Sequence, residues 1–289
     1  VLTVGSPQNA KQLMTSLYNI DAYPDTVTIL PNGGERRIVT RLDPEQEYFL
    51  DGAAAGTIYV SSDTNVATVD ADGVIRGVGP GTATITVMNG WGEDYVKVSV
   101  LPATIGDQVA VDQATGGIVQ NAEGVQIAFG PGGLTGDATV TITSLDESEL
   151  PIPMPTTDLL SFVGAFELQV DGADFNDTVQ IAVPVPAGAG EPGDQVWFFV
   201  SQMLPVGENG ELMEVWTVVD SGTIDADGMA RAKSPPFPGL SDRGKVMIAR
   251  ASMPLPTLKI NVGFTMLNAM IFAPAIGIAA VGGLAGSVS

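Results

Sequence analysis

The strongest constraint on this chain is a run of strict alternation that ends at Val87. Apolar Ala83, Ile85 and Val87 alternate with Thr82, Thr84 and Thr86. A period of two is the pattern of a β-strand with one buried face and one exposed face. Asp72-Gly73 and Gly79-Pro80-Gly81 precede the run, and both sequences favour tight turns. The stretch Ser61–Val87 therefore predicts antiparallel strands of a β-sandwich.

Similar short apolar runs, separated by turn sequences, continue along most of the chain. With 289 residues, the chain is long enough for two domains that each bury a core. We therefore predict an all-β fold of two tandem β-sandwich domains, followed by an apolar C-terminal segment. The predicted boundaries are a lead-in at 1–25, sandwiches at 26–101 and 107–250, and a tail at 258–289.

Three local features support further predictions. Lys11–Ile20 has a brief helix-like spacing of apolar residues, within a lead-in that we expect to lie against the first domain. Pro184 and Pro186 favour an edge position for their strand, because proline cannot donate a ladder hydrogen bond. The chain begins with Val1 rather than Met, which suggests a processed N-terminus.

The charge balance excludes several classes of partner. Asp and Glu number 33 against 12 Lys and Arg, giving a net charge of −21. Such a chain is repelled by nucleic acid and by anionic membrane surfaces, but it suits a cell exterior or cation binding. No nucleic-acid partner is expected.

The chain contains no cysteine and no histidine. Disulfides, thiolate metal sites, cysteine nucleophiles and the usual general base are therefore excluded. Phosphate-binding loop motifs are also absent from the sequence. A glycosidase with paired carboxylates stays open, because 33 acidic residues allow many pairs. We expect a protein that is not an enzyme and has no cofactor.

The region around the alternating run resembles a known family. The matching residues are Ser61-Ser62-Asp63, Val66-Ala67-Thr68-Val69-Asp70, Gly73-Val74 and the segment from Gly77 to Val87. This pattern, over about residues 26–101, is similar to the bacterial immunoglobulin-like group 2 (BIG2) domain. The resemblance implies that the first sandwich is Ig-like. It also implies a spacer or binding module of a bacterial or phage surface protein, without catalytic residues. The family often has Trp where this chain has Val60, which we expect to replace that aromatic side chain in the core.

The second region has a weaker resemblance to a different family. Gly116-Gly117-Ile118-Val119, the segment from Val125 to Leu134, and Thr139-Val140-Thr141-Ile142 are similar to the opening of ZU5-type β-sandwich domains. That family has Pro-Pro-Gly-Ala-Leu where this chain has Gly130-Pro131-Gly132-Gly133-Leu134. The resemblance extends over about residues 107–250 at most and implies a sandwich fold.

Acidic turns are the candidate metal sites. The densest is Asp171–Asp177, where Asp174, Asn176 and Asp177 are the candidate calcium ligands, because calcium prefers six to eight oxygen ligands. The alternative is that Asp and Asn at these positions only stabilise hairpin turns. Trp91, Trp197 and Trp216 are predicted to fill the core or a sheet edge.

The C-terminal segment is the candidate assembly or anchoring element. Leu258, Ile260, Val262 and Phe264 alternate with polar or small residues, and no charge follows Lys259. Ile271 and Phe272 lie in the apolar stretch Thr265–Gly286, which is long enough to span a bilayer. This stretch is interpreted as a membrane anchor, as a segment buried against another subunit or domain, or as local packing on the second sandwich.

These observations favour an extracellular structural or adhesive protein of a bacterial or phage surface. One form is a filament or surface-layer subunit in which Val1–Val4 or Leu258–Phe264 adds a strand to a neighbour. The expected partner is another copy of the chain or another surface protein. The alternative is a carbohydrate-binding or ancillary module of a larger secreted, membrane-anchored protein, with Trp91 or Trp197 contacting the glycan.

Overall fold

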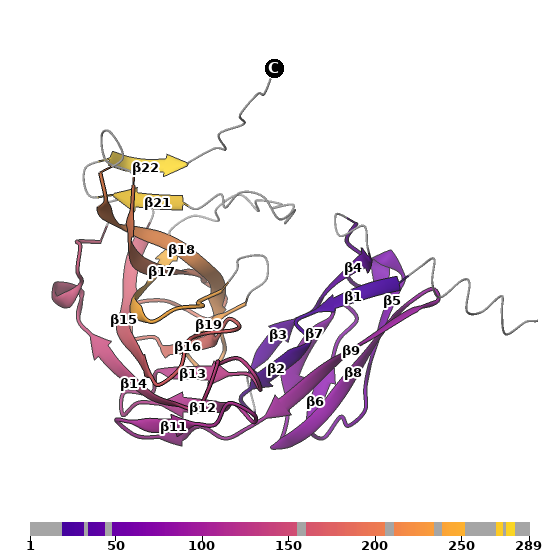
Figure 1. The fold of residues 1–289 in the computed structure, drawn as a ribbon. Helices are drawn as coiled ribbons and strands as arrows, with labels where there is room; N and C mark the ends of the chain where they lie inside the picture. The colour runs from indigo at the N-terminus through magenta and orange to yellow at the C-terminus, as the bar shows by residue number, and fades with distance from the viewer. Residues whose placement is uncertain are drawn as a thin grey trace, which may run out of the picture. The chain divides into compact units, whose positions relative to one another are not determined.

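The chain is described from a computed structural model that divides it into two compact units, residues 1–102 and 103–289. The structure describes residues 19–31, 34–43, 48–154, 160–205, 211–233, 239–251, 270–273 and 276–280, the last two ranges for their backbone alone. Both units are built from β-strands, with two short 3₁₀ helices, η1 (Ala53–Ala55) and η2 (Glu147–Glu149) (Figure 1). The all-β prediction is confirmed for these residues.

The described residues of the first unit form nine strands in three small sheets. They are β1 (Asn19–Tyr23), β2 (Thr26–Ile29), β3 (Glu35–Arg37), β4 (Val39–Asp43), β5 (Thr57–Ser61), β6 (Ala67–Val69), β7 (Val74–Gly77), β8 (Gly81–Asn89) and β9 (Gly92–Val100). The sheet orders are β2-β9-β8-β5, β3-β7-β6 and β1-β4. β2 runs parallel to β9, and the other pairs are antiparallel. Side chains from all but β3 and β4 meet in one core, as in an Ig-like domain.

The alternating run of the sequence forms β8 as predicted. Ala83, Ile85 and Val87 are buried in the core, and the threonines between them are on the other face. Two glycines, Gly77 at the end of β7 and Gly81 at the start of β8, lie where other atoms come close to the backbone. A Cβ on Gly77 would overlap the carbonyl oxygen of Leu30, and one on Gly81 would lie 2.8 Å from a methyl carbon of Val66.

Two local predictions for the first unit are wrong. Val60 is 47% exposed, and the aromatic residue that contacts the core is its neighbour Tyr59. The Tyr59 hydroxyl accepts the N–H of Gly52 at 3.1 Å. Asn19 and Ile20, at the end of the helix-like spacing, belong to strand β1, and Ile20 is a core residue. The rest of that spacing lies outside the described residues.

In the second unit, the part of the chain that the structure describes forms eleven strands on one continuous path, with two more from the C-terminal segment. The eleven are β10 (Thr104–Ile105), β11 (Val109–Val111), β12 (Gly117–Gln120), β13 (Gln126–Phe129), β14 (Ala138–Leu145), β15 (Leu160–Asp171), β16 (Gln180–Pro184), β17 (Gln195–Leu204), β18 (Met213–Ile224), β19 (Met229–Ala232) and β20 (Gly244–Ala251). Their order is β10-β12-β13-β16-β19-β18-β17-β20-β15-β14-β11. β21 (Met270–Ala273) and β22 (Ile276–Ala280) follow from the C-terminal segment.

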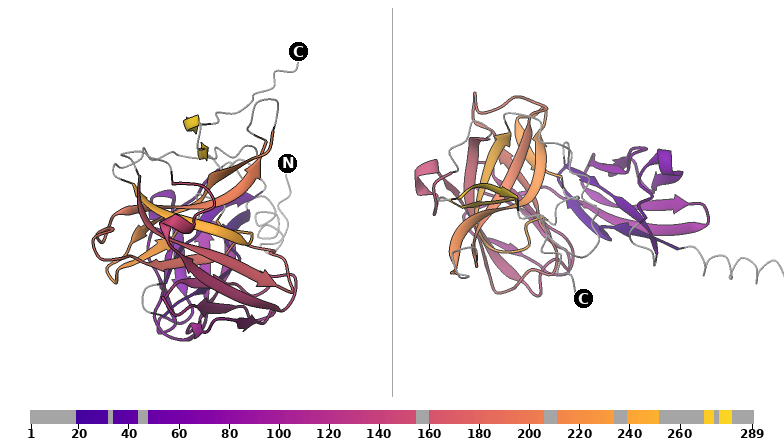
Figure 2. Two further views of the ribbon diagram at one scale, coloured as in Figure 1. Left: turned by 90° about the vertical axis from the view of Figure 1, so that its left-hand side faces the viewer. Right: turned by 90° about the horizontal axis from the view of Figure 1, so that it is seen from above.

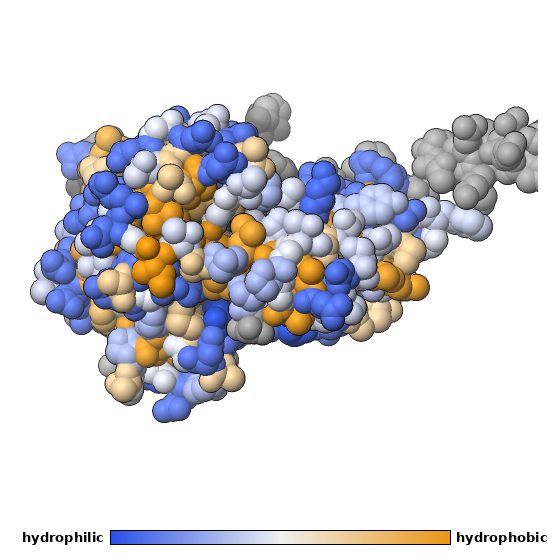
Figure 3. Space-filling view, turned by 90° about the horizontal axis from the view of Figure 1, so that it is seen from below, coloured by the Kyte–Doolittle hydropathy of each residue, from blue (hydrophilic) through white to orange (hydrophobic). Residues whose placement is uncertain are grey.

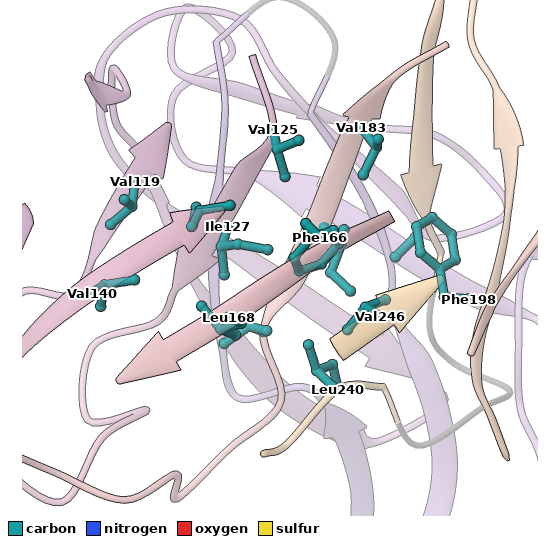
Figure 4. Close-up of a cluster of buried hydrophobic side chains, with 14 of the residues drawn as sticks. Val119, Val125, Ile127, Val140, Phe166, Leu168, Val183, Phe198, Leu240 and Val246 are labelled. Atoms are coloured by element: carbon teal, nitrogen blue, oxygen red, sulfur yellow. The ribbon is translucent and has the colours of Figure 1, made fainter. Parts of the chain in front are cut away.

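This path curls into a nearly closed, barrel-like sheet, as Figures 1 and 2 show. All of its strands except β10 contribute side chains to a single core, part of which is drawn in Figure 4. Phe166 and Phe198, on β15 and β17, are among the largest fully buried side chains there. The predicted pair of separate sheets is therefore replaced by one sheet that encloses its own core. Register shifts at Phe162/Gly164 and Phe198/Phe199 allow long strands to bend.

Asn121 connects the two ends of this path. It follows β12, and its side-chain amide donates to the hydroxyl of Ser144 on β14 at 2.9 Å. Its side-chain oxygen accepts the N–H of Val125 at 2.9 Å. A buried amide with partners on both sides links the strands next to the two edges.

The prediction of an edge position for the Pro184 strand is wrong. β16 pairs with both β13 and β19. The N–H of Val185 donates to Gly228 on the β19 side, so the nitrogen of Pro184 faces the β13 side. The ladder with β13 has already ended there, at the pair Gln126–Ala182. No hydrogen bond is lost, and proline is tolerated within the sheet.

We expect Gly77→Ala to lower the free energy of unfolding of the first unit by about 1–3 kcal/mol, because the methyl group must displace the backbone at Leu30. Urea unfolding followed by Trp fluorescence and circular dichroism measures this change. Gly136→Ala is the control, since its Cβ would meet no atom closer than 4.0 Å. Equal stability of the two variants would contradict the packing role of Gly77.

Candidate assembly and ligand-binding surfaces

Strand β21 carries the two predicted assembly residues that the structure describes. Ile271 is paired with Thr217 of β18, and Phe272 with Trp216, in antiparallel register. β22 then pairs with β21 as a hairpin, which Figure 1 shows beside β18. The other predicted assembly residues lie outside the described residues; they are Leu258, Ile260, Val262 and Phe264.

The edge of β18 that β21 contacts is shared by three segments. β19 pairs with Gly222–Ile224 at one end of the strand. The N–H of Gly239 donates to the carbonyl of Val219 in the middle, at 2.8 Å. β21 occupies only Trp216 and Thr217. The first part of this twelve-residue strand therefore pairs at just two positions with the C-terminal hairpin.

The sheet around β18 is apolar on its outer face as well as on its core face. Trp216, Phe199, Val218 and Met247 form a second cluster, and Trp216 is 0% exposed. The segment after η2 contacts this cluster through Ile152, with Leu150 and Met154 partly buried against it. Sheets that are apolar on both faces need a covering layer on each.

Two buried polar atoms lie where β21 meets β18. Within the described part of the chain, neither the indole N–H of Trp216 nor the hydroxyl of Thr217 has a hydrogen-bond partner. A buried donor without an acceptor costs about 1–3 kcal/mol. Among the described residues, these two side chains are therefore left without hydrogen bonds where β21 pairs with β18.

The first unit carries a separate exposed apolar surface. On the outer face of its four-stranded sheet, one row across β5, β8 and β9 consists of Val60, Thr86 and Tyr95. The neighbouring row contains Ile58 and Met88. Trp91, at the turn between β8 and β9, is 65% exposed. Apolar residues also interrupt the hydrophilic surface on the face drawn in Figure 3.

The prediction that all three tryptophans fill core or edge positions is therefore wrong for Trp91. Trp216 is fully buried, and Trp197 is partly buried against the outer cluster of the second unit. Turn-forming Gly90 and Gly92 flank Trp91, and this context is the signal that could have indicated an exposed position.

The candidate calcium ligands make contacts with other protein groups. Asp174 accepts a hydrogen bond from the guanidinium of Arg243 at 2.5 Å. The side-chain amide of Asn176 donates to the carbonyls of Gly132 and Leu134 at 3.3 Å each, and Asp177 accepts the N–H of Thr178. In the described ranges, no three acidic side chains are grouped closely enough to hold a metal ion. The calcium site stays a prediction.

A second acidic turn is organised by a cation. Arg231 of β19 contacts Asp227 at 2.6 Å and Asp225 at 3.0 Å, and its side chain is almost fully buried. The hydrogen bond from Arg231 holds the pKa of Asp227 below its ordinary value of 3.8. Lys233 adds a contact of 3.4 Å to Asp225. These ion pairs fix the turn between β18 and β19.

The class of the first unit is defined by its strands, which form an Ig-like domain. Residues 49–100 match the family model "Bacterial Ig-like domain (group 2)", so the predicted BIG2 resemblance is confirmed for that segment. Such domains typically occur in bacterial surface proteins. No curated protein matches the chain.

The matched segment is smaller than the structural unit. Strands β1 and β2 precede it, yet Ile20, Val27 and Ile29 belong to the same core. The resemblance of the second unit to ZU5 domains stays a prediction. In the described residues, no helix is long and apolar enough to cross a membrane.

We expect Asp227→Asn to lower the free energy of unfolding by at most about 1 kcal/mol at pH 7, because Asp227 is 45% exposed and solvent screens the pair. The folded-state pKa of Asp227 is lowered, so its stabilisation is present above pH 3.8 and is lost as the pH falls through the folded-state pKa.

Urea unfolding at a series of pH values measures this difference. The gap between parent and variant is expected to close below pH 3.8. Asp242→Asn is the control, because Asp242 is exposed and lies 3.9 Å from the guanidinium of Arg243. A gap of constant size down to pH 2 would contradict the proposed ion pair.

Proposed function

We propose that this chain is a non-enzymatic structural or adhesive component of a bacterial or phage exterior. In its sharper form the protein is a filament or surface-layer subunit that joins other copies, or another surface protein, through its terminal strands or apolar tail. The two β-rich units act as rigid spacers, and their function is mechanical. The group 2 Ig-like segment supports an extracellular, surface-associated location.

The observation that carries the proposal is the pairing of β21 with β18. A strand from the uncharged C-terminal segment adds to the edge of a large sheet. Strand addition gives affinity through backbone hydrogen bonds and needs no specific side-chain chemistry. β22 then becomes the outer strand of that hairpin, and its sequence, Ile-Gly-Ile-Ala-Ala, has no charge or proline to protect an edge.

Charge also favours contact through this segment. The chain carries a net charge of −21, so most surfaces of two copies repel each other. Residues 260–289 contain no charged side chain, and apolar surface of this extent needs a partner. Anchoring of the same segment in a membrane is the alternative use of its apolar character.

We expect deletion of residues 258–289 to abolish assembly while both units keep their folds. Electron microscopy and sedimentation of parent and truncated chains measure assembly, and circular dichroism checks the fold. Deletion of residues 1–18 is the comparison, since it tests the other terminal strand. A chain without 258–289 that still forms regular polymers would disprove assembly through the tail.

Trp91 favours a second candidate function, a carbohydrate-binding or ancillary module of a larger secreted protein. Its exposed indole, with Tyr95 on the following strand, gives aromatic faces on which a sugar ring can stack. Trp197 is less suited, because it is partly buried against the outer apolar cluster.

If this second candidate is correct, a glycan array will give reproducible binding that Trp91→Ala weakens at least about tenfold, as expected for loss of a central aromatic contact. Trp91→Phe is the matched control, because it keeps an aromatic face at the same position. Binding that is unchanged in Trp91→Ala would exclude this surface as the glycan site.

A further inference from the structure

We propose that the edge of β18 at Trp216 and Thr217 is the acceptor site for the β21–β22 hairpin of a second copy of this chain. The inference rests on the proposed function and specifies its contact. The hairpin that pairs with β18 within one chain is exchanged, so that it pairs with β18 of the neighbour in an assembly. The same backbone groups are used in both arrangements.

The connection to the hairpin is long enough for exchange. Residues 252–269 separate β20 from β21, and these 18 residues reach about 60 Å when extended. This length exceeds the diameter of a small domain, so the hairpin can reach its own β18 or that of an adjacent copy. Exchange of an identical element in this way is a low-cost route to association.

The pairing within one chain is short. Only Trp216 and Thr217 are paired with β21, although β18 has twelve residues. In the part of the chain that the structure describes, the Trp216 indole N–H and the Thr217 hydroxyl also have no partner. The acceptor edge therefore holds the hairpin of its own chain through two residue pairs only.

Concentration decides between the two arrangements. Within one chain, the covalent connection gives the hairpin an effective concentration on the order of millimolar. A dilute chain therefore keeps its own hairpin, whereas chains held side by side offer competing hairpins at similar concentration. Exchange therefore links two copies without the loss of a strand pair. A second copy of the chain is the partner that we propose for this edge of β18.

Engineered disulfides test this arrangement directly, because the parent chain has no cysteine. Thr217→Cys and Ile271→Cys chains are mixed, allowed to assemble and oxidised. Pairing between copies places these two positions opposite each other in the ladder, within reach of a disulfide. A non-reducing gel is expected to show a covalent dimer containing one chain of each kind.

The matched control replaces Ile271→Cys with Ala279→Cys. Ala279 pairs with Ile271 on the far strand of the hairpin, two strands away from β18, at about 10 Å. This distance is too long for a disulfide. We expect at least about tenfold less covalent dimer from this mixture, because the register excludes the bond.

The outcomes separate this inference from the proposed function. If polymers form but the mixture gives no dimer above the control, and a Thr217→Cys/Ile271→Cys double variant closes its disulfide within one chain, the exchange is wrong and assembly stands. If the parent chain forms no polymer at any concentration, both are wrong.

A variant without cysteine gives a second readout. Ile271→Pro removes one backbone donor from β21 and is expected to reduce the polymer fraction at least about tenfold. Ser287→Pro, beyond the hairpin, is the control. Polymer formation by Ile271→Pro at the parent level would overturn the proposal.

Discussion

The second unit depends on the burial of both faces of its central strands. On β17 and β20, Phe198 and Ile248 point into the enclosed core, while Phe199 and Met247 belong to the outer cluster. Each such side chain contributes about 1.5–3 kcal/mol when it is removed from water. The curled sheet covers the inner face by itself. The outer face needs additional chain, which the segment after η2 supplies in part.

The sequence predicts the strands of this protein better than their arrangement. Alternation identified β8, because Ala83, Ile85 and Val87 face a core and the threonines between them do not. The same rule fails for β17, where Val196 to Val200 are apolar without interruption. A strand buried on both faces has no period of two, so its pattern does not distinguish a sandwich from a sheet that closes on itself.

Pro184 and Trp91 show why local residue preferences do not predict the position of a residue in the sheet. The effect of a proline depends on which neighbour its nitrogen faces, and at Pro184 the ladder on that side has already ended. The position of a tryptophan depends on the turn that carries it, and Trp91 lies between two glycines at a hairpin. The apolar sequence around Ile271 and Phe272 predicts that these residues take part in assembly. The sequence does not indicate that Ile271 pairs with Thr217, because pairing between distant strands leaves no signal in a local pattern.

Charge and apolar surface divide the chain into regions with different roles. The net charge of −21 keeps copies apart over most of their surface, and this repulsion is screened beyond about 10 Å at moderate salt. A contact between copies therefore forms most readily where charge is absent, and residues 260–289 are such a region. In the proposed assembly, backbone pairing at β18 provides the direction that a purely apolar contact lacks, because a strand adds in one orientation and register. Under this proposal, repulsion elsewhere opposes disordered aggregation, so an acidic body with an uncharged hairpin favours ordered contacts through the hairpin.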